Sequence, residues 1–227
     1  LVGSEMCIRD RAALVGLEPH LSGAILIMGA GAVLMLVGGI NWMWVGGAIG
    51  AAGIMMYLVL FVIGYNASRI EMWHNPWADA QGKGYQLSQS LISIGSGGLL
   101  GVGLGRSRQK FLFLPEEHND FIFAIVCEEL GLIGAAIIML LFAALILRGY
   151  WIALHARDRF GSLLVVGVTT LIGLQTFLNI GVVTGLLPTT GISLPFFSYG
   201  GTALSIQLAE MGIVLSVSRQ MKPTKAG

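Results

Sequence analysis

Residues 114–131, LPEEHNDFIFAIVCEELG, carry five carboxylates and a histidine at the start of an apolar run. Asp120 stands where that run begins, with Glu116 and Glu117 four and three residues before it and His118 between them. Crowded carboxylates near a low-dielectric boundary raise one another's pKa, which suits a general base. An aspartate at the start of a helix is also a common N-cap. The pattern therefore predicts either acid–base chemistry or a helix cap at Asp120.

Two further carboxylates, Glu128 and Glu129, follow eight and nine residues after Asp120. On a helix this places them about 12 Å further along the axis. Carboxylates inside a membrane usually face a cavity or a basic partner. We expect a buried structural pair with an arginine. Glu210, in the last apolar segment, raises the same question.

A basic cluster precedes the acidic stretch in GRSRQK, residues 105–110, and contains Arg106, Arg108 and Lys110. One interpretation is a solvated loop or contact with anionic lipid headgroups. The other is a clamp for a phosphate-bearing substrate, because arginine and lysine side chains both bind phosphate oxygens. In that case the nearby glycines would bring backbone N–H groups close to the anion. These glycines are Gly98, Gly101, Gly103 and Gly105.

A second candidate element is LPFFSYGG, residues 194–201, which precedes an apolar segment. The N-terminus of a helix attracts anions, and Ser198 and Tyr199 add hydroxyl groups there. The alternative is a packing turn in which Gly200 and Gly201 allow close helix contact. Both interpretations stay open at this point.

The composition is typical of a membrane protein, with 55% hydrophobic and only 11% charged residues. Residues 21–68 and 160–209 are free of charge, and each run is long enough for two spanning helices of about 20 residues. We expect an all-α polytopic bundle with about five transmembrane helices, near 21–38, 43–64, 121–147, 161–183 and 200–218. YQLSQSLISI, residues 85–94, predicts a short interfacial or re-entrant helix within a large loop at about 65–120.

Basic residues mark one side of this bundle. The loop 148–159 and the C-terminal tail hold Arg148, Arg157, Arg159, Arg219, Lys222 and Lys225. Short basic loops stay cytoplasmic, so the C-terminus is expected inside and the large loop outside. The net charge of +1 gives no sign of nucleic-acid binding, and no metal-ligand spacing or serine–histidine–aspartate pattern is readable. The residues indicate either chemistry on a lipid-linked anionic substrate or its transport.

Two long segments resemble the signatures of the SEDS family, the FtsW, RodA and SpoVE proteins, and their detail is closer to FtsW and SpoVE. The segments are GYQLSQSLISIGSGGLLGVGLGRSRQKFLFLPEEHNDFIFAIVCEELGLIG and NIGVVTGLLPTTGISLPFFSYGGTALSIQLAEMGIVLSVSRQ. The resemblance implies a ten-helix fold, of which residues 12–227 would be the C-terminal part of one domain. Residues 1–11, LVGSEMCIRDR, resemble an adapter-derived leader and are expected to be non-native.

The resemblance also implies a peptidoglycan glycosyltransferase that polymerises lipid II during division or sporulation and releases undecaprenyl diphosphate. Asp120 falls on the family's invariant aspartate and would be the general base. Residues expected to bind substrate are Glu117, Arg108, Gln109, Lys110, Ser198 and Tyr199. A divalent cation, Mg²⁺ or Mn²⁺, is a further candidate for stabilising the leaving diphosphate.

The expected partners are a class B penicillin-binding protein, other division proteins and membrane lipids, in a bacterial plasma membrane. A lipid II flippase and a non-catalytic division scaffold are the alternatives. Polar residues inside the helices, among them Gln175 and Asn179, keep the flippase interpretation open.

Overall fold

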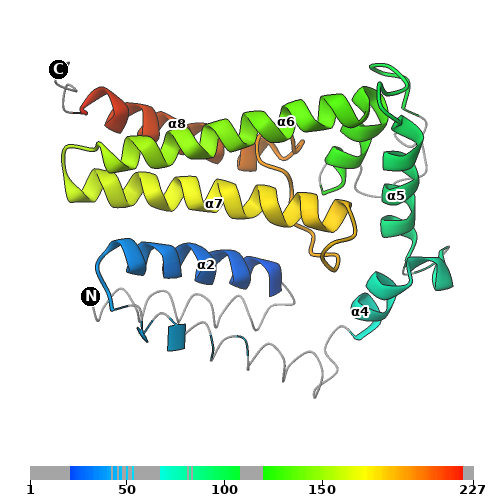
Figure 1. The fold of residues 1–227 in the computed structure, drawn as a ribbon, viewed down its shortest axis with the longest axis horizontal. Helices are drawn as coiled ribbons and strands as arrows, with labels where there is room; N and C mark the ends of the chain where they lie inside the picture. The colour runs from blue at the N-terminus through cyan, green and yellow to red at the C-terminus, as the bar shows by residue number, and fades with distance from the viewer. Residues whose placement is uncertain are drawn as a thin grey trace. The chain divides into compact units, whose positions relative to one another are not determined.

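The computed structural model describes residues 21–41, 67–80, 84–107 and 120–221, with single positions at 43, 44, 46, 47, 50, 53 and 82. Figure 1 shows that these residues form helices joined by turns, and no strand occurs among them. The helices are α2 (Leu21–Val37), α4 (Ala67–His74), the 3₁₀ helix η2 (Pro76–Asp79), α5 (Tyr85–Gly97), α6 (Ile122–Leu154), α7 (Arg159–Val183) and α8 (Gly201–Arg219). The all-α prediction is confirmed.

Four of the five expected spans correspond to α2, α6, α7 and α8. The helix expected at 43–64 lies almost entirely outside the described residues. Three described helices, α6, α7 and α8, are long and apolar enough to cross a membrane, and α2 is a shorter apolar helix. The chain is therefore a polytopic helical membrane protein.

The predicted end of α6 near residue 147 was wrong, since the helix continues to Leu154. The sequence pattern placed the end at the first charged residue, Arg148. In the structure the Arg148 guanidinium lies 4.2 Å from the centroid of the Trp151 ring, one turn further along the same helix. Arginine on an aromatic ring is stabilised by a cation–π interaction, so the charge does not end the helix. The loop between α6 and α7 is correspondingly short.

The described chain forms two compact units, and α6 and α7 each contribute to both. The first unit contains α2, α6 from Met139, α7 up to Thr176, and α8. The second unit contains α4, η2, α5, α6 up to Ile138, and α7 from Phe177 with the turn that follows it to Leu194.

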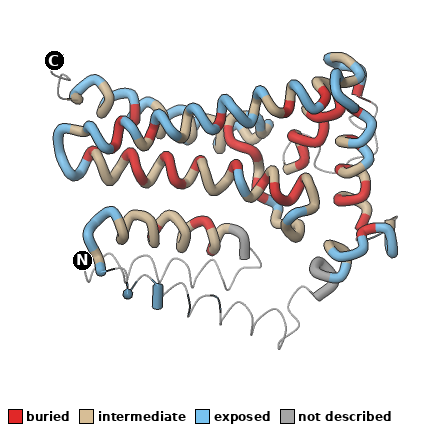
Figure 2. Tube along the Cα trace, in the orientation of Figure 1, coloured by how far each residue is buried: buried red, intermediate tan, exposed pale blue. Residues whose placement is uncertain are grey.

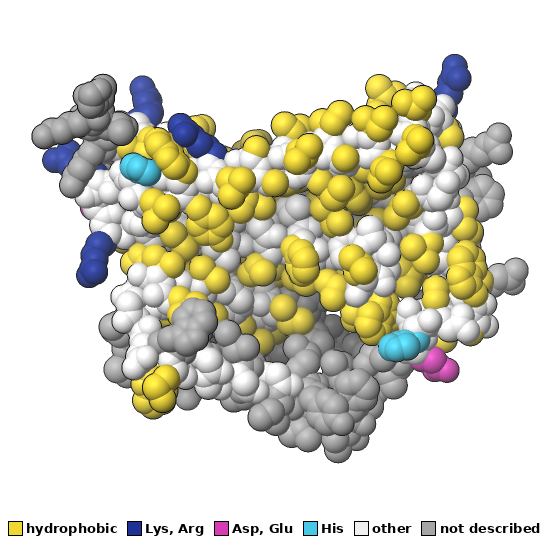
Figure 3. Space-filling model, in the orientation of Figure 1, with side chains coloured by type: hydrophobic (Ala, Val, Ile, Leu, Met, Phe, Trp, Pro, Cys, Tyr) yellow, Lys and Arg dark blue, Asp and Glu magenta, His cyan; other side chains and the backbone are white. Residues whose placement is uncertain are grey.

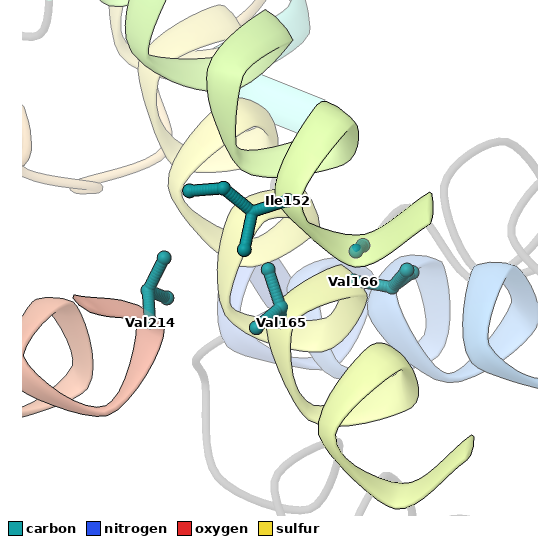
Figure 4. Packing of buried hydrophobic residues seen from close by; sticks show 5 residues of the cluster. Ile152, Val165, Val166 and Val214 are labelled. Atoms are coloured by element: carbon teal, nitrogen blue, oxygen red, sulfur yellow. The ribbon is translucent and has the colours of Figure 1, made fainter. Parts of the chain in front are cut away.

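The core of the first unit lies where α6, α7 and α8 meet (Figure 4). Ile152 of α6 packs with Val165 and Val166 of α7 and with Val214 of α8. Small residues allow the close approach: a Cβ built on Gly149 would lie 2.8 Å from Cγ2 of Thr169. The side chains of Tyr150 and Thr170 add a hydrogen bond of 2.9 Å between the same two helices.

Basic side chains of the first unit gather beside the α6–α7 turn and the C-terminal end of α8 (Figure 3). The described ones are Arg148, Arg157, Arg159 and Arg219. The remaining surface of the α6 span in this view is mostly hydrophobic, as expected of a helix in contact with lipid. This one-sided charge distribution is the pattern from which the sequence predicts the orientation of the bundle.

The second unit is organised around α5, whose buried residues follow one side of the helix (Figure 2). Three of the five buried residues are serines, and two of them bind main-chain carbonyls of other helices. Ser90 Oγ donates to the carbonyl of Val183 at 2.8 Å, and Ser93 Oγ donates to that of Ala124 at 3.1 Å. The helix is where the sequence predicts it. The hydroxyls of Ser90 and Ser93 are buried and bind α7 and α6.

Candidate functional site

Asp120 lies just before the first residue of α6, next to aromatic residues that are buried. The aspartate is partly exposed, whereas the following Phe121 and Phe123 are 4% and 2% exposed. These two aromatic rings anchor the start of α6 in the second unit. The first helical residue is Ile122, so Phe121 takes the N-cap position and Asp120 lies one residue further out. The structure thus places a carboxylate at an accessible point beside a fixed helix end.

Asn179, near the end of α7, fixes the main chain at Asp120. Its amide nitrogen donates to the carbonyl of Asp120 and to the carbonyl of Ile192, each at 2.7 Å. The side chain is only 1% exposed. Sequence reasoning noted Asn179 as a polar residue in an apolar helix but did not connect it with Asp120. The signal was present, because a buried amide requires partners.

Gly191 lies beside the Asp120 carboxylate. Its φ angle is +70°, and a Cβ built on it would lie 3.5 Å from Oδ2 of Asp120. A left-handed conformation of this kind favours glycine. The turn after α7 therefore approaches the carboxylate with bare backbone. No role was assigned to Gly191 from the sequence.

A break in α6 lies further along the same helix, at Gly131, where φ is 67° and ψ is −170°. In a continuous helix the amides of residues 132 and 133 would donate to the carbonyls of residues 128 and 129. A glycine-rich segment after α5 replaces both bonds. The four substitute hydrogen bonds are Leu132 N to Gly98 O (2.9 Å), Ile133 N to Leu99 O (3.2 Å), Val102 N to Glu128 O (3.0 Å) and Gly103 N to Glu129 O (3.1 Å).

These bonds correct one of the interpretations of the glycine-rich segment. Its glycines were expected to present backbone N–H groups to an anion. Gly101 N instead donates to the carbonyl of Gly97 at 2.8 Å, and Gly103 N donates to α6. Both amides are occupied, so the anion role is wrong for these two positions. The segment joins α5 to α6. Its glycines have positive φ angles, which let its main chain come close enough to bond with that of α6.

Glu128 lies inside this junction, with 3% of its surface exposed. Its Oε2 accepts a hydrogen bond from Ser93 of α5 at 3.4 Å and a second, short one from Ser107. The carboxylate therefore links α6 to α5 and to the end of the glycine-rich segment. The expected burial of Glu128 is confirmed. An arginine partner stays a prediction, and Glu129 is half-buried with no described hydrogen bond to Oε1.

The remaining residues predicted for the site fall into two groups. The first group lies outside the described residues and consists of Arg108, Gln109, Lys110 and Glu117. Because Glu116 and Glu117 are not described, the helix face that they were expected to share with Asp120 is not tested. Ser198 and Tyr199 belong to the first unit, and Asp120 belongs to the second. The structure therefore does not test the expectation that these groups meet.

The turn that contains Ser198 precedes α8 and is held by hydrogen bonds within itself and to α8. Ser198 Oγ accepts a hydrogen bond from Gly200 N at 3.3 Å. Phe196 adopts a φ of 65°, and its N–H donates to the side-chain oxygen of Gln207 on α8 at 2.8 Å. No described atom lies within 4 Å of a Cβ built on Gly201, so close helix contact does not explain that glycine. Tyr199 is 85% exposed.

A metal site is not evident in the described part of the chain. There, no three histidine, cysteine, aspartate or glutamate side chains come together. Glu116, Glu117 and His118, the neighbours of Asp120 that could complete such a group, lie outside the described residues. The divalent cation stays a prediction.

The long apolar helices and the polar residues at the start of α6 place the chain among polytopic helical membrane proteins with a polar site at one helix end. The family model of FtsW, RodA and SpoVE, described as "Cell cycle protein", matches residues 6–223. The chain belongs to this family. The family membership that the sequence motifs indicated is therefore confirmed.

Curated relatives of the chain come from several bacteria. It is 46% identical over 209 residues to "Probable peptidoglycan glycosyltransferase FtsW" of Geobacter metallireducens, which covers 92% of the chain and 56% of that relative. It is 48% identical over 205 residues to "Stage V sporulation protein E" of Bacillus subtilis, with 89% and 55% covered. It is 40% identical to "Peptidoglycan glycosyltransferase MrdB" of Escherichia coli K12, with 92% and 57% covered.

Solved structures show the same fold. One is a chain of a peptidoglycan synthase complex that coordinates polymerization and crosslinking, with a TM-score of 0.78 and 27% identity over 97% of this chain and 62% of that one. Another is the rod shape determining protein RodA of Thermus thermophilus, with a TM-score of 0.63 and 26% identity over 97% and 56%. The chain spans a little over half the length of the curated relatives described above.

Proposed function

We propose that the protein to which this chain belongs is a peptidoglycan glycosyltransferase that polymerises lipid II, with Asp120 as general base. The observation that carries the proposal is the placement of Asp120. The residue is partly exposed, its main chain is held by a buried amide, and Gly191 lies beside its carboxylate. The names of the relatives, peptidoglycan glycosyltransferases among them, support the same reaction.

The proposed reaction forms one glycosidic bond and breaks one bond to diphosphate. Asp120 accepts the proton of the 4-hydroxyl group on the acceptor's terminal N-acetylglucosamine. That oxygen attacks the anomeric carbon of the donor's N-acetylmuramic acid. The bond from this carbon to the diphosphate oxygen breaks, and undecaprenyl diphosphate leaves with the electron pair. A base held within hydrogen-bond reach of the attacking hydroxyl typically contributes 10²–10⁴-fold to the rate.

Charged groups near Asp120 in the sequence are proposed to stabilise the leaving group. Arg108 and Lys110 supply positive charge for the diphosphate, and Gln109 adds an amide. Glu117, Ser198 and Tyr199 bind substrate. A divalent cation, where bound, would supply further positive charge at the diphosphate.

The proposed setting is the bacterial plasma membrane, with the C-terminus in the cytoplasm and the Asp120 side outside. The described basic residues of the first unit agree with this orientation, because short basic loops stay cytoplasmic. The proposed partner is a class B penicillin-binding protein that cross-links the new glycan. Its support is the similarity to a chain of a solved peptidoglycan synthase complex.

The test uses the full-length protein with its penicillin-binding partner and purified lipid II in detergent. The wild type is expected to form glycan polymer, and Asp120→Asn is expected to form none above background. Equal polymer from both would overturn the assignment of Asp120. A wild type that forms no polymer but moves labelled lipid II across vesicle membranes would identify a flippase. Neither polymer nor translocation would favour the scaffold.

A further inference from the structure

The side chain of Asn179 uses both of its N–H donors to hold two separate parts of the second unit. One acceptor is the main-chain carbonyl of Asp120, and the other is that of Ile192, both at 2.7 Å. Two carbonyl acceptors can be satisfied only by the NH₂ end of the amide, so its orientation is fixed. A side chain that is 1% exposed and bonded twice has no freedom to move away.

The two carbonyls belong to the two segments that meet at the Asp120 carboxylate. One belongs to Asp120 itself, at the entry to α6. The other belongs to Ile192, the residue after Gly191, whose backbone lies beside Oδ2 of Asp120. One amide therefore sets both the main chain that carries the carboxylate and the turn that faces it.

Packing alone does not explain an asparagine at this position. Its Oδ1 is buried and has no hydrogen-bond partner among the described residues. A buried acceptor without a partner is unfavourable, and a leucine of similar size would avoid that cost. What a leucine cannot do is donate to the carbonyls of Asp120 and Ile192. The residue is thus suited to holding these two segments in one geometry.

We propose that Asn179 is a positioning residue that sets the Asp120 carboxylate against the turn at Gly191 for proton abstraction. The inference rests on the proposed function, because it assigns Asn179 a role in the same reaction. A displacement of about 1 Å in a reacting group can lower a rate by about 100-fold. Loss of the amide should therefore act on the chemical step and leave substrate binding largely unchanged.

The experiment measures lipid II polymerisation by the full-length protein with its penicillin-binding partner, per folded molecule. Asn179→Leu removes both donors at similar volume, and Asn179→Ser keeps a single hydroxyl donor. The matched control is Thr176→Val, three residues earlier on α7, where a buried hydroxyl donates only to Ile172 of its own helix. Asp120→Asn is measured in parallel.

We expect Asn179→Leu to lower kcat at least about 10-fold with KM within about twofold, and Asn179→Ser to be intermediate. Thr176→Val should stay within about twofold of wild type in both constants. The inference is overturned if Asn179→Leu matches Thr176→Val, or if it raises KM with kcat unchanged. Where Asn179→Leu does not accumulate, a wild-type kcat for Asn179→Ser overturns it.

The parallel Asp120→Asn measurement separates the two levels of the account. Background activity of Asp120→Asn with full activity of Asn179→Leu would reject only the positioning role. Wild-type activity of Asp120→Asn would reject the proposed function itself.

Discussion

Gly101 and Gly131 meet backbone to backbone where α6 is broken. A Cβ built on Gly131 would clash with the amide nitrogen of Gly101, and a Cβ built on Gly101 would clash with the carbonyl of Glu129. Both glycines also have positive φ angles, 78° and 67°. The junction between the glycine-rich segment and α6 therefore depends on two positions that carry no side chain.

Replacement of either glycine by alanine should separate the two segments. We expect Gly101→Ala to lose about 1–2 kcal/mol from the left-handed backbone and about 1–3 kcal/mol more from overpacking. Gly105→Ala is the control, because Gly105 also has a positive φ (74°) but no described atom lies within 4 Å of its Cβ position. The free energy of unfolding in detergent should fall clearly further for Gly101→Ala. Equal losses would show that the close approach contributes nothing.

The buried carboxylate of Glu128 should stabilise the same junction through two hydroxyl groups. Glu128→Leu removes this acceptor, and because Ser93 keeps the carbonyl of Ala124, we expect a loss of about 1–3 kcal/mol that falls mainly on Ser107. Glu128→Gln keeps an acceptor oxygen and should cost less. Ser96→Ala serves as a control, because Ser96 donates only to the carbonyl of Ser93 on its own helix. Unfolding in detergent measures all three, and a Glu128→Leu variant as stable as wild type would contradict this role.

Gly191→Ala should reduce activity more than stability. The space beside Gly191 accepts a methyl group at ordinary contact distance, 3.5 Å from Oδ2 of Asp120, so the structural cost is the φ of +70° alone. Gly185→Ala is matched, with a φ of +76° and its nearest Cβ neighbour, a leucine methyl, at 3.7 Å.

Both variants should lose about 1–2 kcal/mol of folding free energy. Only Gly191→Ala adds a methyl group beside the Asp120 carboxylate, where we propose that the acceptor hydroxyl binds. We expect its polymerisation rate to fall at least about 10-fold below that of Gly185→Ala. Equal rates for the two variants would show that the Gly191 backbone does not border the reaction site.

Much of the helical architecture could be predicted from the sequence because charge-free runs and helix length depend on local composition. The starts of α6 and α7 lie within two residues of those predicted. The end of α6 was missed because the stacking of Arg148 on Trp151 depends on side-chain conformation. The apolar run that begins after Asp120 also predicted a helix start there, and α6 begins two residues later at Ile122.

The junction around α6 could not be predicted, because its bonds join residues far apart in the chain. Ser93 and Glu128 are 35 residues apart, and Asn179 and Asp120 are 59 apart. The glycines after α5 were recognisable as an irregular segment. Their partner was not, since the carbonyls they bind become available only where α6 breaks at Gly131. A pattern of residue types cannot show which backbone groups a distant break leaves open.

Asp120 is proposed to remove the proton in glycosyl transfer. The most direct measurement is the initial rate of glycan formation at saturating lipid II by Asp120→Asn, with Asp158→Asn as the control. Asp158 Oδ2 accepts a hydrogen bond from Gly161 N at the start of α7, a bond that asparagine can also accept. We predict a loss of at least about 100-fold for Asp120→Asn and no significant loss for Asp158→Asn. A rate for Asp120→Asn equal to that of the control would contradict the account.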